Sequence, residues 1–165
     1  MDVYTVSFFG HRIITDGLTV ERHLETLIRK LMLEKEYVEF LVGRDGEFDQ
    51  IVSSVIRRCK RTVRNDNSSH IWVLPYPTAQ LRNNAEAFQA YYDQIEICGT
   101  GQHYKYAHQA RNRQMADRSD LVVFYVDHEG GAWQTLQYVK KENISYINFL
   151  RFIEGGISPP LHCRY

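Results

Sequence analysis

Short apolar runs alternate with longer helical patterns along the chain. Each run has the length of a β-strand, and most of the gaps between runs carry apolar residues at helical spacing. Strand and helix in alternation imply right-handed crossovers, so we predict an α/β fold: a Rossmann-like three-layer α/β/α sandwich with a mainly parallel sheet. The strands are expected at Val3–Phe9, Val38–Val42, Ile71–Leu74, Gln94–Cys98, Leu121–Val126 and Tyr146–Leu150.

Three of the gaps have an apolar stripe on one helical face, which we interpret as core. Thr78 is expected to cap the third of these helices. The three stripes are Leu24, Leu27, Ile28 and Leu31; Phe48, Ile51, Val52, Val55, Ile56 and Cys59; and Leu81, Ala85, Phe88 and Tyr92.

Length and composition predict one domain. The 165 residues, 44% of them apolar, are enough for a single core, which we place at 1–154, with an irregular tail at 155–165. No stretch has the order of a signal peptide or the roughly 20 apolar residues that cross a bilayer, so we expect a cytoplasmic protein without membrane contact. The cysteines Cys59, Cys98 and Cys163 are odd in number and lack CxxC spacing, which predicts neither disulfides nor a cysteine-ligated metal.

The charges balance, with 20 basic and 20 acidic residues. Nucleic-acid binders normally show a basic excess, so this composition disfavours nucleic acid as a partner. The one basic cluster closes the second predicted helix, where cations complement the helix dipole and stay solvated. That cluster is Arg57, Arg58, Lys60, Arg61 and Arg64.

Ligands of such folds collect outside the carboxyl ends of the strands, which selects the loops Gly10–Gly17, Gly43–Asp49 and Asp127–Trp133. In the last of these, Gly130 and Gly131 stand between a strand and a helix start, whose amide N–H groups and positive dipole end favour an anion. We therefore predict a phosphate-bearing ligand there, with Glu129 beside it.

The first loop presents Gly10, His11 and Arg12 directly after a buried strand. The glycine permits close approach of the backbone, and the two following side chains can donate to phosphate. A turn glycine followed by a surface arginine is the equally weighted alternative. We assign His11 to a ligand contact rather than to acid–base chemistry, because no partner stands near it in sequence.

The second loop combines Gly43 and Gly46 with acidic residues at a helix start, where carboxylates would repel a phosphate. Asp45 is instead expected to accept hydrogen bonds from ribose hydroxyls or to help hold a hydrated Mg²⁺ ion. The alternative is that Asp45 and Asp49 only cap the helix.

The segment 103–120 mixes aromatic, titratable and cationic side chains on one helical face, so it faces more than a core. We expect Arg111 to point at the ligand and Arg113, on another face, to pair with Asp117. Trp133 could stack on a base, but packing under the helix start is the favoured interpretation.

Four motifs stand in order along the chain. They are Phe8-Phe9-Gly10-His11-Arg12, Gly43-x-x-Gly46-x-Phe48-Asp49, Arg111-Asn112-Arg113-x-Met115-x-Asp117-x-Ser119-Asp120, and Gly130-Gly131 before Tyr138. Together they resemble the SLOG superfamily, which joins the Smf/DprA DNA-processing proteins with the Lonely Guy phosphoribohydrolases, and the chain looks closest to the small YpsA-type members (DUF1273). The resemblance spans nearly the full length and implies a Rossmann-like fold with a site for nucleotides or nucleotide-derived ligands.

The resemblance to Lonely Guy enzymes places Arg111, four residues before Met115, at the catalytic arginine of that family. The position of its catalytic glutamate holds Gln137, which cannot ionise and therefore cannot stabilise an oxocarbenium charge. Glu129, Asp127 and Asp45 are the carboxylates left to replace it.

We therefore expect a sensor or regulatory module that binds a nucleotide or a nucleotide-derived ligand. The alternatives are an N-glycosidic or phosphoribosyl hydrolase and a DNA-processing accessory protein, which would need a basic face. A C2 homodimer is the default for soluble homo-oligomers, and we predict one.

Overall fold

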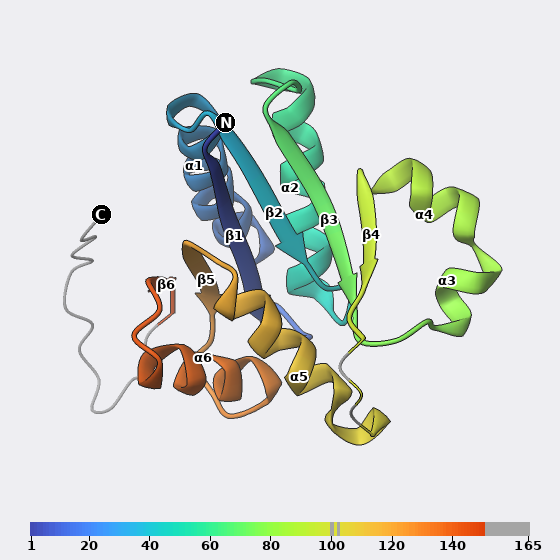
Figure 1. Ribbon diagram of the computed structural model, residues 1–165. Helices are drawn as coiled ribbons and strands as arrows, with labels where there is room; N and C mark the ends of the chain where they lie inside the picture. The colour runs from blue at the N-terminus through green and yellow to red at the C-terminus, as the bar shows by residue number, and fades with distance from the viewer. Residues whose placement is uncertain (100, 102, 151–165) are drawn as a thin grey trace, which may run out of the picture.

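The computed structural model describes residues 1–99, 101 and 103–150, so the expected tail at 155–165 lies outside the described residues. Strands and helices alternate along it, and every predicted strand is present (Figure 1). The elements are β1 (Val3–Gly10), α1 (Gly17–Glu34), β2 (Tyr37–Val42), α2 (Glu47–Thr62), β3 (Ser68–Leu74), α3 (Ala79–Asn83), α4 (Ala85–Tyr91), β4 (Gln94–Ile97), α5 (Tyr104–Asp117), β5 (Leu121–Tyr125), α6 (Gly131–Lys141) and β6 (Tyr146–Asn148).

The strands form one parallel six-stranded sheet in the order β4-β3-β2-β1-β5-β6. The chain builds outward from β1 to β4, then returns to the other side of β1 with β5. Gly10, the last residue of β1, pairs with Tyr125, the last residue of β5. The loops that follow these two strands therefore meet where the strand order reverses, the place where open α/β sheets bind ligands.

Helices cover both faces of the sheet, as the three-layer prediction requires (Figure 1). On one face, Leu24 and Ile28 of α1 and Val52 of α2 pack in a cluster with Phe8 and Phe40 from the strands. On the other face, residues of α5 and α6 pack in a second cluster against side chains of β1, β3 and β5. The Rossmann-like α/β/α fold is confirmed.

The third predicted helix is interrupted. Thr78 caps α3 as expected, its hydroxyl oxygen accepting from the Leu81 amide. Asn84 then leaves helical geometry, with φ −133° and ψ 31°, and its side-chain amide donates to the Gln80 carbonyl oxygen. Asparagine is a weak helix former because its side chain competes for backbone hydrogen bonds. The single apolar stripe is therefore divided between α3 and α4.

The described cysteines, Cys59 and Cys98, are both free thiols, and Cys163 lies outside the described residues. Burial raises the pKa of both described thiols above the ordinary range. Within the described part of the chain, no helix has the length and apolarity needed to cross a membrane.

Candidate functional site

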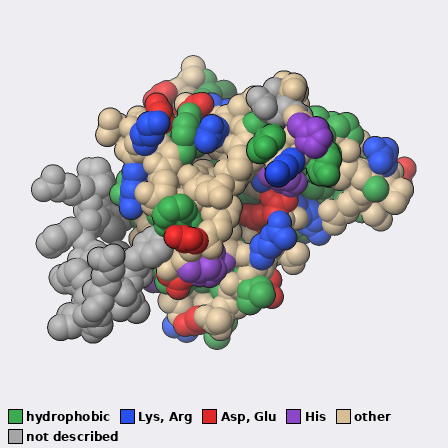
Figure 2. Space-filling view, turned by 90° about the horizontal axis from the view of Figure 1, so that it is seen from below, with side chains coloured by type: hydrophobic (Ala, Val, Ile, Leu, Met, Phe, Trp, Pro, Cys, Tyr) green, Lys and Arg blue, Asp and Glu red, His purple; other side chains and the backbone are tan. Residues whose placement is uncertain are grey.

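A cleft of about 530 Å³ opens at the carboxyl ends of the central strands, bordered by the starts of α2 and α6 and by α5. Figure 2 looks at this edge and shows acidic, basic and histidine side chains close together rather than a surface of one charge. Trp133 does not line the cleft but packs against the core cluster under α6, as the favoured interpretation held. The predicted residues that do line it are Gly10, His11, Arg12, Gly43, Asp45, Gly46, Arg111, Glu129, Gly130 and Gly131.

Close packing requires glycine at two of these positions. A Cβ atom on Gly10 would lie 2.3 Å from Cγ of Phe48, and one on Gly46 would lie 2.4 Å from the backbone Cα of Arg12. The amide of Glu47 donates to the Arg12 carbonyl oxygen (2.9 Å), so the first loop lies directly on the start of α2. These glycines let β1 and the first loop pack closely on α2, so contact within the protein already accounts for their missing side chains.

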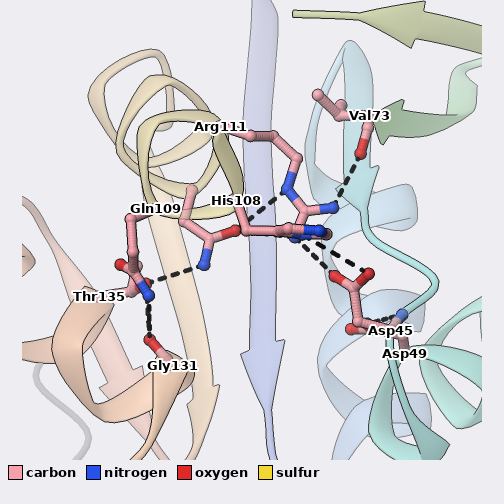
Figure 3. A network of polar contacts seen from close by, with 9 residues as sticks. Asp45, Asp49, Val73, His108, Gln109, Arg111, Gly131 and Thr135 are labelled. Carbon is pink, nitrogen blue, oxygen red and sulfur yellow. Dashed lines mark hydrogen bonds and ion pairs between the residues drawn. The ribbon is translucent and has the colours of Figure 1, made fainter. Parts of the chain in front are cut away.

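Arg111 ties three segments together at the centre of this edge (Figure 3). Its side chain is only 5% exposed. Nη2 donates to Asp45 Oδ2 at 2.6 Å, and Nη1 donates to the carbonyl oxygen of Val73, at the end of β3, at 3.2 Å. Nε and Nη2 also donate to Oδ1 of Asn112. The guanidinium therefore borders the cleft with most of its donors already used inside the protein.

The network continues from Arg111 to the opposite wall (Figure 3). The amide of Asn112 donates to Thr135 Oγ1 at 3.2 Å, and that hydroxyl donates to the Gly131 carbonyl oxygen at 3.1 Å. Gln109 Nε2 approaches the same carbonyl oxygen at 3.5 Å. Because all of these groups are fixed on α5 and α6, they hold the start of α6 in place.

Arg113 does not behave as predicted. It lies over the ring of Tyr138 with 5.1 Å between the guanidinium carbon and the ring centroid, and Asp117 accepts from the Tyr138 hydroxyl. The expected Arg113–Asp117 ion pair does not form, because an aromatic side chain from α6 lies between α5 and α6 and engages both groups. The hydrogen bond to Asp117 raises the pKa of Tyr138 to about 12.

The acidic loop after β2 is closed by its own contacts. Asp49 Oδ2 accepts from the Asp45 amide at 2.8 Å. The N-cap residue of α2 is Gly46, which has no side chain that could cap the helix. Asp49 therefore ties the loop rather than capping the helix. Burial raises the pKa of Asp49 to about 6, helped by the neighbouring charge of Asp45 and opposed by the Asp45 amide and by Arg111.

The start of α6 is open by contrast. Its first turn holds no acidic residue, and no side chain caps it. In the described part of the chain, nothing accepts from the amides of Gly131, Ala132 and Trp133. A Cβ on Gly130 would meet no atom within 4 Å, so packing does not require glycine there. These free N–H groups and the helix dipole offer a place for an anion.

Two histidines stack beside this helix start. The rings of His11 and His128 lie 3.5 Å apart at 13°, and Nε2 of His11 accepts from the Asp127 amide at 3.0 Å. Burial and the neighbouring His128 lower the pKa of His11, opposed by the Asp127 carboxylate. Sequence analysis missed His128, although it stands next to Asp127 in a loop that the fold selects.

Arg12 and His108 also face the cleft. The side chain of Arg12 is exposed and, among the described residues, its guanidinium makes neither a hydrogen bond nor an ion pair, so it can reach a ligand. His108 lies three residues before Arg111 on α5, with Nδ1 3.9 Å from Asp45 Oδ1 and its ring edge-on to Tyr76. Burial lowers the pKa of His108, and the Asp45 carboxylate opposes that shift.

Known structures share this fold. The chain matches DNA processing protein A from Helicobacter pylori at 18% identity and a TM-score of 0.60, and DprA from Streptococcus pneumoniae at 17% and 0.62. Each match covers 87% of this chain, but only 63% and 49% of the respective neighbour chains. No protein-family model matches the chain, and no curated protein matches it in sequence.

Both neighbours are DprA proteins, and at this identity the likeness shows a shared fold. The expectation that nucleic acid is a disfavoured partner is wrong, because the Helicobacter neighbour with this fold has a described single-stranded DNA binding mode. A balanced net charge does not exclude nucleic acid, because contacts depend on the local arrangement of charges. The closeness to YpsA-type proteins and the homodimer stay predictions.

Proposed function

We propose that the cleft binds a nucleotide or a nucleotide-derived ligand, with its phosphate at the start of α6. One observation carries the proposal: the first turn of α6 presents amide N–H groups without an internal acceptor, beside the open Gly130. The position, where the strand order reverses next to β1, is the one that ligands of open α/β sheets use. Phosphate there would replace water on donors that the fold leaves unpaired.

Charged side chains around the helix start suit the same ligand. The guanidinium of Arg12 makes no hydrogen bond or ion pair among the described residues and can form a charge-assisted bond to phosphate, and His11 borders the same space. Asp45 gives one carboxylate oxygen to Arg111 and directs the other toward His108, so its exposed edge can accept from a ribose hydroxyl. A hydrated Mg²⁺ ion at Asp45 stays a prediction.

We propose binding, in a sensor or regulatory role, rather than hydrolysis. Gln137 occupies the position of the Lonely Guy glutamate and cannot ionise. Of the three carboxylates that could replace it, Asp45 is paired with Arg111 and Asp127 contacts His11 and His128, which leaves Glu129 as the one without an ion pair among the described residues. Turnover of a nucleotide by the purified protein would contradict this part of the proposal.

The direct test is calorimetric titration of the full chain with adenosine monophosphate and, separately, with adenosine. Binding of the nucleotide and about tenfold weaker binding of the nucleoside would support a phosphate site. Arg12→Ala should weaken nucleotide binding, whereas Arg22→Ala, an exposed arginine on α1 outside the cleft, should leave it unchanged. Equal affinities for the two ligands, or no binding of either, would contradict the proposal.

Binding of single-stranded nucleic acid is a second candidate function, and one observation favours it. The Helicobacter neighbour, similar over 87% of this chain, has a described single-stranded DNA binding mode. Fluorescence anisotropy with a labelled oligothymidylate tests it: the affinity should fall steeply as salt rises, because cations are released from the backbone on binding. Anisotropy that stays flat at low salt would exclude this candidate.

A further inference from the structure

We propose that His11, Asp127 and His128 form a binding site for a divalent transition-metal ion of the zinc class. One nitrogen from each imidazole and one carboxylate oxygen lie within 4.8 Å of one another. The residues come from the loops after β1 and β5, which the parallel pairing of the two strands brings together. This site shares His11 with the border of the proposed phosphate position, but its ligands are side chains and not the α6 amides, so metal binding does not require a bound phosphate.

The donor atoms are close enough to share an ion once the ring of His128 rotates out of its stack on His11. Asp127 Oδ1 lies 3.1 Å from His11 Nε2 and 2.6 Å from His128 Nδ1. Ligands at about 2.1 Å from a tetrahedral ion stand roughly 3.4 Å apart, so Asp127 Oδ1 would move about 0.3 Å further from His11 Nε2 and about 0.8 Å further from His128 Nδ1. His128 is exposed and lies in a surface loop, so its ring can make that adjustment.

The donor atoms also define the class of ion. Two imidazole nitrogens with one carboxylate oxygen suit zinc, cobalt or nickel, whereas Mg²⁺ prefers oxygen ligands alone. In the structure the Nε2 lone pair of His11 accepts from the Asp127 amide at 3.0 Å, so an ion would bind His11 by displacing that hydrogen bond. His11 is only 9% exposed on its side chain, so one ligand is held firmly by the fold.

Three protein ligands leave the remaining coordination positions of the ion to solvent or to a bound molecule. Zinc ions that bind a substrate or a water molecule typically have three protein ligands, whereas structural zinc sites have four. Here the open side faces the cleft, because His11 and His128 both line it. A bound ion would therefore have a coordination position open to water or another molecule, beside Glu129 and the start of α6.

The test is calorimetric titration of the chelator-treated full chain with zinc chloride, in the absence of nucleotide. We expect one ion at micromolar affinity, weakened by about tenfold or more in His128→Ala, since even residues that only orient metal ligands are worth that much. His128 is 66% exposed on its side chain, so this variant should keep the wild-type melting temperature. His108→Ala is the matched control, a histidine of the same cleft outside the cluster, and it should bind zinc like the wild type.

Cobalt(II) supplies a second measurement, because its visible absorption becomes stronger when protein side chains hold it at lower coordination than water does. The wild type and His108→Ala should give the same spectrum, and His128→Ala should lose it. Zinc binding that is equal in the wild type and His128→Ala, or absent in both, would overturn the proposal. Since no nucleotide is present, this failure would leave the phosphate site untouched, and failure of nucleotide binding would leave the metal site untouched.

Discussion

The two walls of the cleft have the same order of strand, glycine turn and helix, but they differ in which polar groups remain free. On each wall a parallel strand leads through a glycine-containing turn into a helix: β2 through Gly43 and Gly46 into α2, and β5 through Gly130 and Gly131 into α6. On the α2 wall, neighbouring atoms crowd both glycines and the polar groups bond to one another. On the α6 wall, Gly130 has open space and the helix amides lack acceptors among the described residues.

The difference shows that a glycine turn before a helix is not by itself an anion site. At α2, Glu47 and Asp49 already occupy the favourable end of the helix dipole. Asp45 also neutralises the guanidinium of Arg111, the cation that could otherwise have attracted an anion to this wall. Only the α6 wall keeps an unneutralised helix start, and this is why we place the phosphate there.

The sharpest test of the comparison is Gly10→Ala. A methyl group here would lie 2.3 Å from Phe48 Cγ, so β1 and α2 must move apart, and we expect a loss of about 3 kcal/mol in the free energy of unfolding. A Cβ at Gly130 would have no atom within 4 Å, so Gly130→Ala should change the free energy of unfolding by less than about 0.5 kcal/mol. Urea denaturation measures both, and equal effects would remove the distinction between the two walls.

Asp45→Ala tests the closed polar network of the α2 wall. It leaves the buried guanidinium of Arg111 without its carboxylate, so we expect a loss of about 2 kcal/mol in unfolding free energy. Glu129→Ala, on the α6 wall, removes a carboxylate with no ion-pair partner among the described residues and should be neutral. Thermal and urea unfolding check the pair, and a neutral Asp45→Ala would show that the network contributes no stability.

Gly130→Ala also tests the open α6 wall through binding. A methyl group beside the helix amides should hinder the approach of phosphate and weaken adenosine monophosphate by about tenfold, or 1.4 kcal/mol. Gly99→Ala is the matched control, because its Cβ likewise meets nothing and Gly99 does not line the cleft. Calorimetry should separate the two variants; identical affinities would place the ligand elsewhere.

The smallest expected effect is a pH dependence at Asp49. Its pKa of about 6 lies above the ordinary 3.8, so the folded protein holds this proton more tightly than the unfolded chain. This group therefore lowers stability as pH rises from about 4 to 6, and the full cost remains above that window. Asp49→Asn keeps an acceptor for the Asp45 amide, and we expect it to be about 1 kcal/mol more stable than the wild type at neutral pH.

The stabilities of the wild type and Asp49→Asn should converge near pH 3, about one pH unit below the ordinary pKa of 3.8, where Asp49 is largely protonated in both the folded and unfolded states. Urea unfolding at several pH values checks this. A constant difference between wild type and Asp49→Asn across the range would mean that the carboxyl group titrates normally.

Much of the fold was readable in the sequence, because the period of apolar residues depends on local geometry. Six strands and the faces of α1 and α2 appeared at the predicted places, and the general rule for parallel sheets selected the loops that line the cleft. The break at Asn84 was missed because one apolar stripe continues across it. The Arg113–Asp117 pair was wrong because local spacing cannot show that Tyr138 lies between α5 and α6.

Tertiary structure decided which groups are free, because that depends on partners far apart in the chain. Arg111 bonds to Asp45 across 66 positions, and His11 accepts from the Asp127 amide across 116. Composition showed only a balanced net charge and could not show which helix start keeps its donors. The sequence by itself determined the sheet and the glycine loops at its edge. The pairing of β1 with β5, and the contacts of each loop, determined which wall is closed and which can bind.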